Sequence, residues 1–151
     1  MHENLKSLLY SYFLSYFCIM DLMDCRDYIL SLPEVEESQP FDDEVVVYKI
    51  GGKWFAVVIF SRGGYLAVKC NPDRAIILRD RYSAITPAWH FNKRHWNDLL
   101  VAQLPDEVVK REIRHSYFCV VKKGVVPKSR RCELLVLASE AGIVDDAELF
   151  Y

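Results

Sequence analysis

The spacing of apolar residues changes from a helical period to a strand period early in this chain. Between residues 21 and 32, apolar side chains recur every three or four positions, at Leu22, Cys25, Ile29 and Leu32. Asp21 precedes this pattern as an N-cap, and Pro33 ends it because proline cannot continue an α-helix. The pattern predicts a helix over residues 21–32, followed by a loop in the acidic, proline-interrupted segment PEVEESQPFDDE.

The next segments have the composition of β-strands. Glu44–Ile50 and Lys53–Phe60 are rich in Val, Ile, Tyr, Phe and Trp, and the two-residue Gly-Gly link between them is a strong hairpin signal. A turn at Ser61–Gly64 leads to a third strand, Tyr65–Cys70. The sequence therefore predicts a three-stranded antiparallel meander.

The second half of the chain predicts helices separated by less regular segments. Asn71-Pro72-Asp73 combines a cap residue, a proline at the first helical position and an acid, and so begins a helix that runs to about Tyr82. Ala75, Ile76 and Leu78 are expected to face the sheet. Ser83–His95 has no sustained period, and Trp96–Val101 is consistent with a further strand.

Two more helices are expected near the C-terminus. One opens at Leu104-Pro105-Asp106-Glu107 and carries a stripe formed by Val109, Ile113, Ser116 and Val120. The other covers Arg131–Ala141. The predicted fold is therefore α+β, with an antiparallel meander packed against helices.

Length and composition favour one globular domain with flanking segments. The chain has 151 residues, of which 52% are hydrophobic and 26% charged. We expect an apolar extension over residues 1–19, a domain over 20–131 and an acidic, partly helical tail over 132–151. The apolar run Leu8–Met20 is shorter than the roughly 20 residues that cross a bilayer, and no small-residue cleavage site follows it. We therefore expect a cytoplasmic protein that does not contact a membrane.

The cysteines and the charges restrict the chemistry further. The five cysteines form no C-x-x-C pair and are odd in number, which favours reduced thiols over a zinc site or a disulfide framework. Charge is divided unevenly: residues 1–40 hold two basic and seven acidic side chains, residues 41–131 hold seventeen and nine, and residues 132–151 hold none and five. A basic centre between acidic ends can attract phosphate, and the alternative is that these Lys and Arg side chains are simply solvated.

One segment resembles a known family closely. The run TPAWHFNKRHWN, residues 86–97, is similar to the signature of the MmcQ/YjbR family, and further matching pieces occur in family order at Ser31–Pro33, Lys49–Ala56, Lys69-Cys70 with Pro72, and His115–Tyr117. The resemblance covers roughly Met20–Arg131. It implies an α+β fold similar to bacterial frataxin-like (CyaY-like) proteins, and a DNA-binding role described for the family as a double-wing motif.

The same run supplies the candidate binding residues. Basic donors interleaved with aromatic side chains suit nucleic acid, although Asn92 can equally bond its own loop, and Trp96 is of a type more often found in a core. Hairpin turns at Gly51-Gly52 and Ser61–Gly64 would serve as wings. The predicted nucleic-acid contacts are Lys49, Lys53, Lys69, His90, Asn92, Lys93, Arg94, His95 and Trp96. We expect a monomer that binds duplex DNA through phosphates, without sequence preference and without chemistry on the DNA.

Other function classes have weaker support. His90, His95, His115, Cys70 and Cys119 qualify for catalysis by residue type alone, and no known catalytic spacing links them. No phosphate-binding glycine motif is present. We therefore expect no enzyme, no catalytic residues and no cofactor.

Two alternatives remain open. The first is an acidic ridge that binds iron or another hard cation, formed by Asp24, Asp27, Glu34, Glu36, Glu37, Asp42, Asp43 and Glu44. The second is a module that binds a protein partner through the apolar N-terminal arm or the acidic tail.

Overall fold

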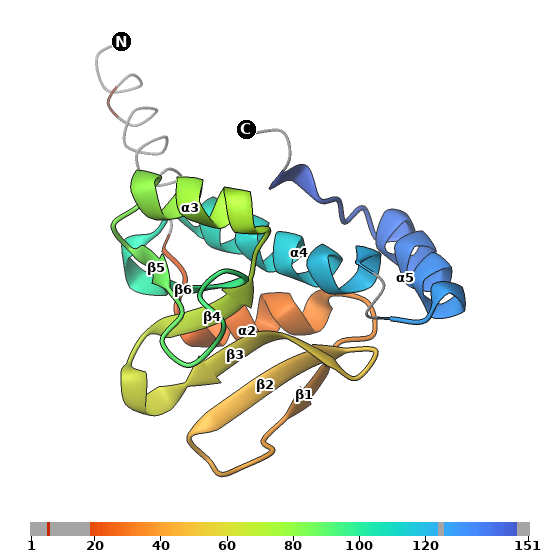
Figure 1. Cartoon of the computed structure of the whole chain (residues 1–151), viewed down its shortest axis with the longest axis horizontal. Helices are drawn as coiled ribbons and strands as arrows, with labels where there is room; N and C mark the ends of the chain where they lie inside the picture. The colour runs from red at the N-terminus through yellow and green to blue at the C-terminus, as the bar shows by residue number, and fades with distance from the viewer. Residues whose placement is uncertain (1–5, 7–18, 124–125, 148–151) are drawn as a thin grey trace.

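The computed structural model of the chain describes residues 6, 19–123 and 126–147. The strands are β1 (Glu36–Ser38), β2 (Val45–Ile50), β3 (Lys53–Ile59), β4 (Tyr65–Lys69), β5 (Ile85–Pro87) and β6 (Trp96–Leu100). The α-helices are α2 (Leu22–Ser31), α3 (Pro72–Arg81), α4 (Asp106–Lys122) and α5 (Lys128–Glu140). Figure 1 shows the β2–β3 hairpin on one side of the molecule and α3, α4 and α5 on the other, so the predicted α+β fold is confirmed.

The described strands form one sheet in which every neighbouring pair is antiparallel. Their order is β1-β2-β3-β4-β6-β5. The predicted meander of β2, β3 and β4 is present, and β1 extends it at one edge. The chain then passes through α3, returns at the other edge as β5, and inserts β6 between β5 and β4. Sequence analysis missed β1 and β5 because strands of three residues are too short to show a period.

The predicted caps begin the first two described helices. The Asp21 carboxylate accepts the Asp24 backbone N–H at 2.8 Å, and the Asp24 carboxylate accepts the Asp21 N–H at 3.0 Å. This reciprocal pair is a capping box. Asn71 Oδ1 accepts the Asp73 N–H at 3.0 Å and Pro72 occupies the first turn of α3, which confirms the start expected there.

The β2–β3 turn depends on its two glycines. Gly51 and Gly52 have φ values of +57° and +76°, a region that side-chain-bearing residues rarely adopt. A Cβ on Gly51 would also lie 3.2 Å from a methyl carbon of Val126, in the segment before α5. The glycine thus lets the hairpin tip approach the end of the helical layer.

Strand register separates two faces of the sheet. Val46, Val58, Leu66 and Leu99 lie opposite one another on successive strands and are all buried in the main core beneath the helices. On α4, the predicted stripe of Val109, Ile113, Ser116 and Val120 is entirely inaccessible to solvent and faces this core. The Ser116 hydroxyl accepts the Lys69 N–H at 2.8 Å and donates to the Phe55 carbonyl, which ties α4 to β4 and β3.

The opposite face carries a smaller apolar cluster. Val47, Val57 and Ala67 lie side by side on it, and Ala88 and Trp96 complete the buried set. Phe91 packs against this cluster from the segment between β5 and β6. The segment that holds the family-like run therefore folds over the face that the helices leave uncovered.

The C-terminal part packs onto α4. Helix α5 runs through residue 131 without interruption, so the division expected there does not coincide with a break in structure. Leu134, Ala138 and Ala147 are buried, and the Arg114 guanidinium bonds the Asp146 carboxylate at 3.0 Å. Residues 132–147 are acidic, as expected, but they belong to the packed structure.

The remaining predictions concern the buried face of α3, the apolar extension and contact with a membrane. Ala75 and Leu78 are buried as predicted, whereas Ile76 is 64% exposed, because it lies on the opposite side of α3. The apolar extension lies outside the described residues up to position 18, apart from Lys6. Within the described ranges, none of the helices has the length and hydrophobicity needed to cross a bilayer.

Candidate nucleic-acid interface

The loop between β5 and β6 is held by bonds within itself. Asn92 Oδ1 accepts the Arg94 backbone N–H at 2.9 Å, which is the structural one of its two expected roles. The Lys93 ammonium donates to the Ala88 carbonyl at 2.9 Å, and Arg79 from α3 donates to the Lys93 carbonyl. The loop therefore presents its outward side chains from a fixed backbone.

The aromatic residues of this loop serve packing more than binding. Phe91 and Trp96 stack with ring centroids 4.6 Å apart, and Trp96 is only 7% exposed. Trp96 therefore has no free face for a base, and we remove it from the candidate contacts. Trp89 is 69% exposed, with the Arg62 guanidinium 5.6 Å from its ring.

The polar and basic members of the predicted set reach solvent to different extents. His90, Asn92, Lys93, Arg94 and His95 are exposed, as is Lys53 at the start of β3. Lys49 and Lys69 are half-buried. Lys49 lies directly opposite Glu36 of β1, so a carboxylate faces it across the strands.

Lys69 links the loop to the end of α4. Its ammonium lies 5.6 Å from the centre of the Trp96 ring. The pKa of Lys69 is lowered, chiefly by burial and further by the like charges of Lys53 and Lys123, while Cys119 acts in the opposite direction. Cations from β3, β4 and the end of α4 are thus close enough to repel one another.

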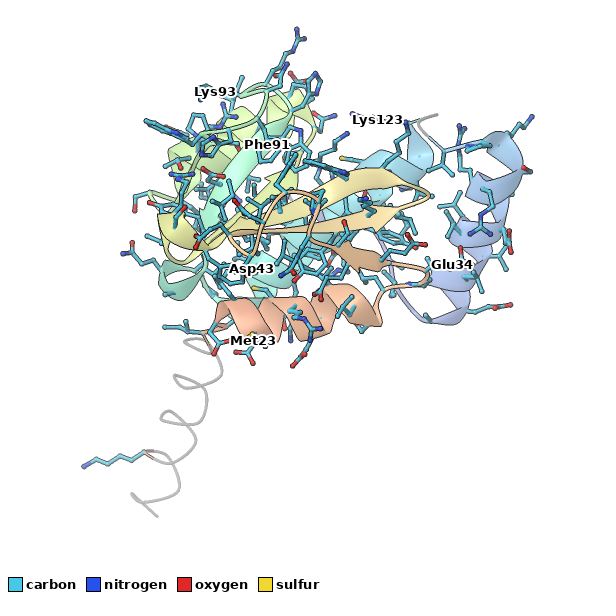
Figure 2. All side chains as sticks on the ribbon, turned by 90° about the horizontal axis from the view of Figure 1, so that it is seen from below. Met23, Glu34, Asp43, Phe91, Lys93 and Lys123 are labelled. Carbon is cyan, nitrogen blue, oxygen red and sulfur yellow. The ribbon has the colours of Figure 1, made fainter. Side chains whose placement is uncertain are left out.

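We call the cations on this side of the molecule the basic rim, defined as Lys53, Lys69, Lys93, Arg94 and Lys123. Figure 2 shows Lys93 and Lys123 on the same side of the molecule, opposite Met23. Within residues 19–123 and 126–147, none of the five forms an ion pair with a carboxylate. Lys123 is not among the contacts predicted from the sequence, and its electrostatic interaction with Lys69 adds it to the set.

The expected wings do not converge on this rim. Gly51-Gly52 and Ser61–Gly64 lie at opposite ends of β3, which separates them by roughly 20 Å at the usual rise per residue. Arg62 is also occupied, because its guanidinium bonds the buried Asp98 carboxylate and lies 4.7 Å from the Tyr65 ring centre. Only the Gly51-Gly52 turn therefore borders the basic rim, through Lys53.

The acidic ridge is partly neutralised. Glu37 pairs with Arg26 at 2.7 Å, Glu34 pairs with Arg130, and Asp42 accepts the Glu44 backbone N–H at 2.9 Å. In the described part of the chain, no three His, Cys, Asp or Glu side chains are grouped so as to hold a metal ion. The predicted ridge therefore supplies no preformed cation site there.

The fold also brings together residues that the sequence left unconnected. Cys70, His115 and Cys119 were candidates by residue type only, yet Cys119 Sγ lies 3.4 Å from His115 Nε2, and Cys70 contacts the same imidazole. Asp145, from the expected tail, lies 3.3 Å from His115 Nδ1. The one signal in the sequence was the four-residue spacing of His115 and Cys119, which places both on one face of a helix.

The family model of YjbR matches residues 30–119 of this chain, which include the basic loop, all six described strands and most of α4. The chain belongs to the YjbR family. It is 30% identical over 103 residues to the uncharacterised protein YbdF of Escherichia coli O157:H7, covering 68% of this chain and 84% of that protein. It is 29% identical over 120 residues to the uncharacterised protein YjbR of Escherichia coli strain K12, covering 78% and 98%.

Solved structures agree with this family assignment. Protein DR2400 of Deinococcus radiodurans, described as a DUF419 domain, superimposes with a TM-score of 0.70 at 32% identity, over 84% of this chain and 91% of that one. A Pseudomonas syringae protein superimposes with a TM-score of 0.56 at 23% identity, over 64% and 96%, which shows a shared fold alone. The solved structures therefore support the fold described above, and the family model and the relatives support the assignment to the YjbR family.

Proposed function

We propose that this YjbR-family chain binds duplex DNA by contacting phosphates with the basic rim, without sequence preference and without chemistry on the DNA. The observation that carries the proposal is a group of five cations with no carboxylate partner among the described residues. Neutralising such a group with phosphates releases counterions from DNA, which supplies most of the affinity of non-specific complexes.

The loop aromatics favour a duplex over a single strand. Proteins that bind single strands stack bases on free aromatic faces. Here Phe91 and Trp96 stack on each other, and Trp89 is engaged by Arg62. Exposed basic side chains on a fixed loop are better suited to a phosphate backbone, and His90 and His95 add further donors beside Arg94.

The proposal includes the setting in which the protein acts. We infer a monomer in the cytoplasm, where DNA is accessible and thiols stay reduced; the four described cysteines, Cys25, Cys70, Cys119 and Cys132, are free. The metal alternative has no group of three ligands in the described residues to support it. The protein-partner alternative relies on the apolar arm, most of which lies outside the described residues, or on the acidic tail, part of which packs onto α4.

Fluorescence anisotropy of a labelled duplex of about 20 base pairs tests the proposal. We expect a Kd in the range of roughly 1–100 µM at physiological salt, as for other non-specific complexes. An unlabelled duplex of scrambled sequence should compete as well as the original sequence, and a single strand of the same length should compete less well. Absence of binding in low salt would reject the proposal. Stronger competition by the single strand would show that single-stranded DNA, and not the duplex, is the preferred ligand.

A further inference from the structure

A polar cluster lies where the C-terminal half of α4 meets the end of β4. His115 and Cys119 are one helical turn apart on α4 and point to the same side. Cys70 follows β4, and Asp145 comes from the segment after α5. Three separate parts of the chain therefore contribute to one site, which the proposed DNA contact does not use.

The bond lengths arrange these groups around the imidazole. Asp145 Oδ1 lies 3.3 Å from Nδ1 of His115, and Nε2 lies 3.4 Å from Cys119 Sγ. The Asn71 backbone N–H donates to Nε2 at 3.1 Å, so the neutral ring carries its proton on Nδ1 and directs it at Asp145. Nε2 has a single lone pair in the ring plane, so the Asn71 N–H and the Cys119 thiol share it.

The electrostatic setting favours the protonated form of the imidazole, and therefore favours transfer of the thiol proton to it. Burial acts to lower the pKa of His115, but the hydrogen bond with Asp145 and the contacts with Cys119 and Cys70 outweigh burial and raise it. Burial tends to raise the pKa of Asp145, and the bond with His115 reverses this and lowers it. By contrast, burial raises the pKa of Cys70, which keeps that thiol protonated.

The members of the cluster differ in their exposure to solvent. His115 and Asp145 have side chains that are each 6% exposed, and Cys70 is 3% exposed. Cys119 is partly exposed, and it is the member of the cluster with the most access to solvent. The arrangement of a reachable thiol, a buried base and a buried carboxylate matches the geometry that activates nucleophiles in enzymes.

The surroundings of Cys119 are cationic. Lys69 interacts electrostatically with Cys119 and with Lys123, and the Lys122 ammonium lies 3.7 Å from the Asp145 carboxylate. Figure 2 shows Lys123 on the same side of the molecule as Lys93. Positive charge near a thiol attracts anionic reactants and stabilises the thiolate.

We propose that Cys119 is a reactive thiol that forms mixed disulfides with small anionic disulfides, of which glutathione disulfide is an example. The thiol proton passes to His115 Nε2, where it displaces the hydrogen bond from the Asn71 N–H, and the thiolate sulfur attacks one sulfur of the disulfide. The new bond joins Cys119 to one half of the reagent, the old S–S bond breaks, and the leaving thiolate takes the proton from His115. No further oxidant is required.

Cys132 provides a matched comparison within the same chain. It is exposed on α5, whereas Cys119 is only partly exposed. No hydrogen bond or ion pair involves Cys132 in the part of the chain that the structure describes. If exposure alone decided reactivity, Cys132 would react first, whereas activation by His115 favours Cys119.

The test uses the full chain carrying Cys18→Ser, so that the four cysteines of the described region remain. The protein is incubated with glutathione disulfide without DNA, and peptide mass spectrometry follows the mixed disulfide at each position. We expect Cys119 to react at least roughly tenfold faster than Cys132, since general-base catalysis contributes factors of this size or larger. A faster reaction at Cys132 would overturn the proposal.

Variants test whether His115 and Asp145 activate Cys119, and a second reagent tests the preference for anions. Asp145→Asn and His115→Gln should each slow Cys119 by about tenfold or more while the rate at Cys132 stays the same. Cys25 is completely buried, so labelling of Cys25 identifies a variant that has unfolded. The cationic disulfide cystamine should lower the ratio of the Cys119 rate to the Cys132 rate. An unchanged Cys119 rate in folded Asp145→Asn would reject the role of the imidazole, and an unchanged ratio would reject the preference for anions.

Discussion

The buried cation Arg74 and the cations of the basic rim have opposite surroundings. Arg74 is 3% exposed on α3, and its guanidinium bonds both oxygens of Glu112 on α4, at 3.1 and 2.6 Å. It also donates to the Ala147 carbonyl at 2.6 Å, which fastens the end of the described chain. The five cations of the basic rim, in contrast, have no carboxylate within the described residues.

The difference separates charges that hold the fold from charges that the fold does not require. A buried guanidinium needs a partner, because an unpaired buried charge costs several kcal/mol. An exposed lysine needs none, since water solvates it, but grouping several of them adds repulsion, which lowers the pKa of Lys69 together with burial. We therefore explain the grouping of these cations by binding rather than by stability.

The largest expected effect comes from breaking the buried pair. The Glu112 carboxylate is 2% exposed, and Arg74→Ala leaves it with Arg111, at 3.0 Å, as its remaining ion-pair partner among the described residues. We expect a loss of about 3–5 kcal/mol in the free energy of unfolding. Urea denaturation of the variant and the parent chain measures it. The double variant Arg74→Met with Glu112→Met should recover much of the lost stability. If Arg74→Ala alone is as stable as the parent chain, the buried pair does not hold the fold.

A smaller effect, dependent on pH, is expected at Asp145. Asp145→Asn removes a charged hydrogen-bond partner of the buried His115, which should cost about 1.5–3 kcal/mol at pH 5.5. The pKa of His115 is raised above its ordinary 6.5, so its contribution is complete below pH 6.5 and declines as the pH rises toward the raised value. The pKa of Asp145 is lowered below its ordinary 3.8, so its contribution is present above pH 3.8 and is lost as the pH falls through the lowered value.

The raised pKa of His115 and the lowered pKa of Asp145 together predict that Asp145→Asn loses most stability between about pH 4 and 6.5. The difference in unfolding free energy between parent and Asp145→Asn should therefore be larger at pH 5.5 than at pH 8.5. Urea denaturation at both values provides the comparison. Equal differences at the two pH values would show that the carboxylate acts through packing alone.

The smallest effect on stability should follow removal of rim charges. Lys53, Arg94 and Lys123 are exposed and make no side-chain hydrogen bond or ion pair among the described residues. Replacing all three with glutamine should change the free energy of unfolding by less than about 0.5 kcal/mol, or raise it slightly as repulsion falls. Thermal and urea denaturation check this, and a loss comparable to that of Arg74→Ala would show that the rim is part of the folded framework.

Much of the fold was predictable because it is encoded in local periodicity. The Gly-Gly hairpin, the capped starts of α2 and α3 and the buried stripe of α4 all follow from patterns within a few residues of one another. The edge strands β1 and β5 were not predictable, because three residues show no period. Their pairing is set by β2 and β6. Burial of Arg74 was equally hidden, because its partner Glu112 is distant in the sequence.

The candidate sites show the same limit. The basic loop was recognisable because its cations are contiguous, but the stacking of Phe91 on Trp96 depends on how the loop lies on the sheet. The relation of Lys69 to Lys123, and that of His115 to Asp145, join segments that only the fold brings together. Residue type thus identified several participants, and three-dimensional packing decided their roles.

The salt dependence of DNA binding tests the central claim most directly. Anisotropy titrations across a salt series should compare the parent chain, the Lys53, Arg94 and Lys123 triple glutamine variant, and a control triple variant. The control replaces Arg26, Lys110 and Arg130 with glutamine, an equal charge change at cations that have carboxylate partners. We predict that the rim variant binds more weakly and loses roughly 2–3 from the slope of log affinity against log salt, while the control keeps the parental slope. Equal slopes for the two variants would contradict the claim that the unpaired cations of the basic rim form the phosphate-binding surface.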